Sequence, residues 1–147
     1  MAAPDPFKLL RVLEDVSETH AKTLRALERT LNRLRRDPGD EALQSLALTY
    51  IKRLRVLRRR IERQLGDEGM EAEFGDVNPE VARNVATLSE YMIIVGFLYE
   101  EELLRKALIL ARRGARLLAE EAANIEADLD MISRLSERFQ RIVDAHY

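Results

Sequence analysis

The stretch Tyr91–Tyr99, YMIIVGFLY, constrains the fold more than any other part of the chain, because it lies in a long helical pattern and is apolar on every side. A helix that is hydrophobic all round must be covered all round. At about 100° per residue, one stripe of this helix contains Leu88, Met92, Val95, Tyr99, Leu103 and Leu110. A second stripe contains Ile93, Phe97, Leu104 and Leu108. One neighbouring hairpin cannot cover both stripes, so we expect a second copy of the chain on the second one; the alternative is that another helix of the same chain covers it.

Capping and turn residues predict a first helical hairpin over residues 5–66. Asp5 can cap a helix in which Pro6 occupies the first position, where its missing N–H group costs nothing. The segment Asp37–Asp40, DPGD, is typical of a turn, and Asp40 is placed to cap a second helix that runs to about Leu65. Two helices of similar length joined by a short turn pack antiparallel.

A second hairpin is predicted over residues 78–146, after an acidic linker at 67–77. Asn78 can cap its first helix, with Pro79 at the first position. Gly114 is the only breaker before the C-terminus, and we expect a break near it; the alternative is one helix from Pro79 to about Ala145. The predicted fold is therefore all-α: a single domain, 1–147, forming a four-helix bundle of two long antiparallel hairpins that dimerises through the helix beginning at Pro79.

Composition excludes several classes of site. The chain has no Cys, so disulfides, thiolate zinc sites and Cys nucleophiles are ruled out. Its N-terminus lacks the basic and apolar regions of a signal peptide, and its longest apolar run is nine residues, against about 20 for a membrane span. We therefore expect a cytoplasmic protein that is not inserted in a membrane.

The positive charge of the chain is concentrated in the first hairpin. Up to Gly66 there are 15 Lys and Arg residues against 9 Asp and Glu, whereas from Asp67 onward there are 9 against 17. Two basic rows lie opposite the apolar stripes of the two helices: Arg25, Arg29, Arg33 and Arg36 on the first, and Lys52, Arg55, Arg59 and Arg63 on the second. These rows can contact the phosphates of a nucleic acid, dock an acidic partner, or serve only as a solvated face.

His20 lies in the apolar stripe of the first helix, where an imidazole can bind a metal, transfer protons, respond to pH or simply fill the core. A metal site in a helical bundle usually includes Glu-x-x-His motifs on two helices, and this sequence has none. We expect a structural His20, no metal and no cofactor. The acidic clusters at 100–102, 120–121 and 126–130 are expected to be solvated surface.

Near the C-terminus, Arg141 and His146 have Arg-x4-His spacing. This spacing resembles the ribonuclease motif of HEPN-domain proteins, which are small helical bundles and often dimers. The resemblance covers only these two residues and implies RNA cleavage by them.

The sequence favours a non-catalytic interaction or scaffold subunit that acts through the second apolar stripe and its charged faces, as a homo-oligomer and with another protein as a plausible partner. The alternative is a nucleic-acid-associated subunit that contacts a phosphate backbone through the basic hairpin. A HEPN-like ribonuclease is a remote third hypothesis. No residue is predicted to be catalytic on composition or spacing alone.

Overall fold

The computed structural model describes residues 5–69, 71 and 78–147, and all the regular structure in these residues is helical, which confirms the all-α expectation. A five-residue π-helical turn, η2, joins two α-helices without interruption, so Pro79–Arg112 is one helical stretch of 34 residues. Part of the predicted linker, residues 70 and 72–77, lies outside the described residues. The elements are α1 (Pro6–Arg36), α2 (Glu41–Leu65), α3 (Pro79–Tyr91), η2 (Met92–Gly96), α4 (Phe97–Arg112), α5 (Arg116–Glu120) and α6 (Ala122–His146).

Three helices begin where the capping residues predicted. The Asp5 carboxylate accepts a hydrogen bond from the Phe7 amide at 3.0 Å. The Asp40 carboxylate accepts from the Leu43 amide at 3.0 Å, and the Asn78 side chain accepts from the Glu80 amide at 2.9 Å. Each bond satisfies a backbone donor that lacks a partner within its helix.

The predicted break near Gly114 is present. Gly114 has a φ of 110°, a conformation that favours glycine, and α4 has ended at Arg112. The Ala115 amide bonds back to the Leu110 carbonyl at 3.1 Å, which is the six-residue hydrogen bond of a Schellman motif. The glycine therefore turns the chain within three residues.

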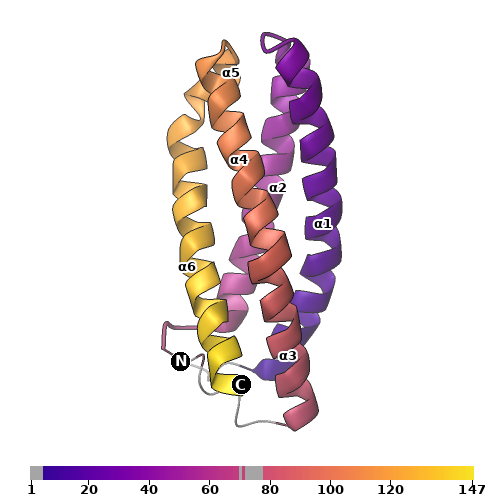
Figure 1. The fold of residues 1–147 in the computed structure, drawn as a ribbon, viewed down its shortest axis with the longest axis vertical. Helices are drawn as coiled ribbons and strands as arrows, with labels where there is room; N and C mark the ends of the chain where they lie inside the picture. The colour runs from indigo at the N-terminus through magenta and orange to yellow at the C-terminus, as the bar shows by residue number, and fades with distance from the viewer. Residues whose placement is uncertain (1–4, 70, 72–77) are drawn as a thin grey trace.

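Gln44 of α2 compensates for a poor helix cap at this turn. Ala115 precedes α5 and has no side chain to cap it, but the Gln44 Oε1 atom accepts from the Leu117 amide at 2.7 Å. The Nε2 atom of the same side chain donates to the Pro38 carbonyl at 3.0 Å. One buried amide thus binds both turns at the same end of the molecule (Figure 1).

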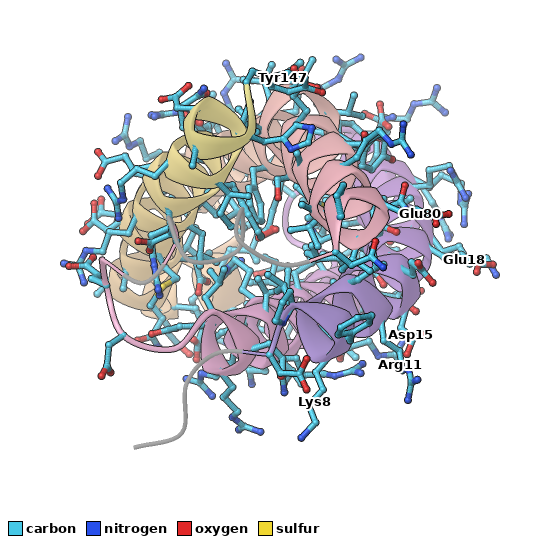
Figure 2. The ribbon with its side chains drawn as sticks, turned by 90° about the horizontal axis from the view of Figure 1, so that it is seen from below. Lys8, Arg11, Asp15, Glu18, Glu80 and Tyr147 are labelled. Atoms are coloured by element: carbon cyan, nitrogen blue, oxygen red, sulfur yellow. The ribbon has the colours of Figure 1, made fainter. Side chains whose placement is uncertain are left out.

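The long helices run side by side along the length of the molecule (Figure 1). The helix α1 packs on α2 and on the α3–η2–α4 stretch, and α6 packs on the other flank of that stretch. By contrast, α2 and α6 approach each other at few positions. Figure 2 looks along the helices and shows an interior filled by side chains, whereas Lys8, Arg11 and Glu18 point outward.

The α3–η2–α4 stretch does not bury the face that we predicted from its sequence. Phe97 and Leu104, assigned to the outer stripe, are only 1% and 0% exposed, and Ile93 and Leu108 are half-buried against the same core. Ile93, Phe97, Leu104 and Leu108, predicted as an oligomer interface, are therefore covered within the chain, which is the alternative expectation, and do not form an exposed stripe. The reason is that the stretch contacts both α1 and α6, so its buried arc is wide enough to take in parts of both predicted stripes.

A different set of apolar side chains faces solvent. We call this set the apolar outer face. Its members are Tyr91 (38% exposed), Ile94 (63%), Val95 (46%) and Leu98 (61%).

Phe97 tests this corrected placement. Its ring stacks on that of Phe139 with centroids 5.6 Å apart, so Phe97→Ala should lower the free energy of unfolding by about 3–5 kcal/mol in urea titrations. Val56 is 54% exposed, and Val56→Ala should change stability by less than about 0.5 kcal/mol. A small effect of Phe97→Ala would contradict its burial.

Candidate functional site

A network of polar and charged side chains crosses the interior and joins four of the long helical segments. It contains one residue each from α1, α4 and α6 and two from α2. Four members are at most 4% exposed, and Arg55 is partly exposed at the edge. The members are His20, Arg55, Arg58, Glu100 and Asp128.

Glu100 of α4 bonds to α1 and α2 at once. Its Oε1 atom lies 2.7 Å from the Nε2 atom of His20, and its Oε2 atom accepts from Nη1 of Arg58. Because an ionised carboxylate only accepts hydrogen bonds, the Nε2–H group of His20 is the donor. Both carboxylate oxygens are therefore satisfied although the side chain is 0% exposed.

Asp128 of α6 holds the two arginines of α2. It accepts from Nη2 of Arg58 at 2.5 Å, and from Nε and Nη2 of Arg55 at 2.7 and 2.8 Å. The hydrogen bonds and charge of Asp128 raise the pKa of Arg55 above its usual value, although burial opposes this. Two guanidinium groups and two carboxylates balance in charge, which makes their burial tolerable.

The positions of these residues follow from helical spacing. His20 lies in the apolar stripe of α1, Arg58 lies between Leu54 and Ile61 on α2, and Asp128 lies between Ile125 and Ile132 on α6. All of these neighbours are buried, so each polar residue occupies a core position. The expectation of a structural, buried His20 agrees with this placement.

Two acidic residues were wrongly predicted to be solvated. Glu100 and Asp128 each belong to an acidic run, and their neighbours Glu102 and Asp130 are indeed exposed. Helical spacing contained the missed signal, because both positions interrupt apolar stripes. Arg58, which pairs with both, was also missed, although it interrupts the stripe of α2 in the same way.

The π-helical turn lies directly against the network. A Cβ atom on Gly96 would lie 3.4 Å from Cε1 of His20 and 3.1 Å from Sδ of Met92. Glycine at this position therefore lets the helix backbone pass close to the imidazole. Phe97, the next residue, packs the edge of its ring against His20, with centroids 6.1 Å apart.

A second buried ion pair lies near the C-terminal ends of α2 and α6. Arg138 donates through Nε to Glu71 and through Nη2 to the Asp67 carbonyl at 2.9 Å. Glu71 also accepts from the Gly69 amide at 2.9 Å. Burial raises the pKa of Glu71, but these hydrogen bonds and the charge of Arg138 outweigh burial and bring the pKa below its usual 4.5.

The predicted basic rows are exposed, with one exception. Arg55 turns toward α6 and bonds to Asp128, so it belongs to the buried network instead of the solvent-facing row. The other seven side chains reach solvent: Arg25, Arg29, Arg33 and Arg36 on α1, and Lys52, Arg59 and Arg63 on α2.

Arg141 and His146 both lie on α6, and no hydrogen bond joins them. Arg141 is exposed and its Nη2 atom lies 3.6 Å from Oε1 of Glu71, whereas His146 packs against the ring of Tyr147 at 4.7 Å. The two residues are thus engaged with different neighbours.

The inner part of the network offers no open reaction centre. His20 and Glu100 are bonded to each other and are 1% and 0% exposed, so the arrangement fixes helices and gives a substrate no access to the imidazole. Within residues 5–69, 71 and 78–147, no three His, Cys, Asp or Glu side chains are arranged to hold a metal ion.

The helical stretch Pro79–Arg112 is long and apolar enough to cross a membrane, and 44% of its most apolar window is buried inside the protein. The core helix of a soluble protein meets the same criterion. Comparison with protein-family models, curated proteins and solved structures finds no match to this chain.

Asp128→Ala should lower the free energy of unfolding by about 3–5 kcal/mol, because two guanidinium groups lose their shared buried partner. Asp130→Ala, at an exposed position of the same helix, is the matched control and should cost less than about 0.5 kcal/mol. Urea unfolding monitored by circular dichroism measures both, and equal effects would refute the paired burial of Asp128.

Glu71→Gln should weaken the acid sensitivity of the fold. The folded-state pKa of Glu71 is lowered, so its stabilising effect is present above about pH 4.5 and is lost as pH falls through that lowered pKa. Urea unfolding at pH 7 and about pH 3 should therefore show a smaller loss of stability for Glu71→Gln than for the unaltered chain. Identical losses would contradict the ion pair with Arg138.

Proposed function

We propose that the chain is a non-catalytic scaffold subunit, a four-helix bundle that dimerises through its apolar outer face. The observation that carries this proposal is the exposure of Tyr91, Ile94, Val95 and Leu98 on one helical stretch. Large apolar side chains gathered on one exposed face mark interaction surfaces. Isolated exposed apolar residues elsewhere, such as Val56, need no such explanation.

A second copy of the chain suits this face because the face is self-complementary. A two-fold axis between Ile94 and Val95 would pair each of them with the other, and Tyr91 with Leu98, across an antiparallel helix contact. Such isologous pairing is the commonest way to form a homodimer.

The charged residues beside the apolar outer face also favour a second copy of the chain as the partner. Glu101 is held by Arg105 at 2.8 Å and Glu102 by Lys106 at 3.5 Å, each within α4. Two of the acidic side chains next to the face, Glu101 and Glu102, are therefore locally neutralised. Two identical copies can approach without the repulsion that an uncompensated charged border would cause.

Ile94→Glu tests the proposal. Light scattering during size-exclusion chromatography should show a dimer for the unaltered chain and a monomer for Ile94→Glu. A buried, unpaired carboxylate should raise the dissociation constant by about a hundredfold or more. Because Ile94 is 63% exposed within one chain, helical content measured by circular dichroism should not change.

Val56→Glu is the matched control, since Val56 is 54% exposed on α2, outside the apolar outer face. It should leave the dimer intact. A monomeric unaltered chain at high micromolar concentration would refute the proposal, and so would an Ile94→Glu dimer as tight as the original.

A further inference from the structure

A cleft of about 200 Å³ opens between α2 and α6 at the edge of the charged network. Its lining includes the guanidinium-bearing residues Arg55, Arg58 and Arg59, the amide of Asn124 and the carboxylate of Asp128. Arg55 and Arg58 are balanced by Asp128 and by Glu100 behind the cleft, so the uncompensated positive charge of the lining is that of Arg59. The cleft lies between α2 and α6, which approach each other at few positions.

Asp128 positions two of the arginines without using all their donors. Arg55 bonds to Asp128 through Nε and Nη2, which leaves its Nη1 group for a ligand. Arg58 is 1% exposed, and its Nε atom has no hydrogen-bond partner, alone among the buried side-chain nitrogens and oxygens of the described residues. Positive charge and donor capacity are thus fixed beside the cleft before any ligand arrives.

Arg59 supplies the solvent-exposed guanidinium group of the cleft. It is exposed and forms no ion pair with another residue in the part of the chain that the structure describes. A guanidinium group presents paired N–H donors that match the oxygens of a phosphate, and a free one at the mouth of a cleft can close over such a ligand.

We propose that this cleft binds the phosphoryl group of a small molecule. A phosphoryl group offers three acceptor oxygens, which match the unused guanidinium donors of Arg55 and Arg59 better than the two oxygens of a single carboxylate do. The volume suits one such group, whereas a nucleic-acid strand would need a row of contacts along its backbone. Arg55 and Arg59 hold the phosphoryl oxygens, Arg58 contributes charge, and Asn124 lies at the rim. This inference is independent of dimerisation.

Isothermal titration calorimetry of the full chain with inorganic phosphate and pyrophosphate, at constant ionic strength, tests the proposal. Saturable binding is expected, with acetate binding much more weakly. Arg59→Gln should weaken binding about tenfold or more, because it removes charge-assisted hydrogen bonds. Arg59→Lys keeps the charge but loses the paired donors. Its affinity for phosphate should lie between that of the unaltered chain and that of Arg59→Gln.

Arg29→Gln is the matched control, because Arg29 is exposed on α1 and does not line the cleft. It should bind phosphate as the unaltered chain does. Circular dichroism should show the same helical content for all variants.

Three outcomes would overturn the proposal. One is the absence of saturable phosphate or pyrophosphate binding at millimolar concentration. Another is equal weakening by Arg29→Gln and Arg59→Gln, which would mean general attraction of an adventitious ion only. The third is binding of mixed-sequence single-stranded DNA or RNA without binding of either small anion, which would make a nucleic-acid backbone the source of the phosphates.

Discussion

The burial of Arg58 is the constraint on which the rest of the interior depends. A guanidinium group that is 1% exposed requires charge compensation, and Glu100 and Asp128 supply it from two other helices. Those carboxylates in turn need further donors, which His20 and Arg55 provide. The relative placement of four helical segments is therefore specified by a connected set of polar contacts as well as by apolar packing.

The buried arginine side chains also shape the surface between α2 and α6. On the side between α2 and α6 the two helices approach each other at few positions, and long arginine side chains bridge it at two levels. Aliphatic side chains would leave such a gap open or draw the helices together. Bridging it with guanidinium groups keeps a charged cleft at the surface and a filled interior behind it.

Local sequence signals were enough to predict where most helices begin and end. Asp5, Asp40 and Asn78 act through hydrogen bonds to residues two or three positions away, and Gly114 through its own backbone angles. The buried face of α3–η2–α4 was not predictable in this way, because it depends on contacts with two neighbouring helices. Glu100 and Asp128, each within an acidic run, resembled surface residues; their places within apolar stripes indicated burial, but not the arginine partners on another helix.

The hydrogen bonds of Gln44 oppose the sliding of one helix along another, which apolar packing alone does not prevent. Leucine and isoleucine contacts can be re-formed after one helix slides along another by a turn, about 5.4 Å. The amide of Gln44 cannot follow such a shift, because it bonds to Pro38 and Leu117 at fixed points of two turns. Together with the network at Arg58 and the contacts of Arg138 with Leu65 and Asp67, it holds the helices at three positions along and just beyond α2 against longitudinal sliding.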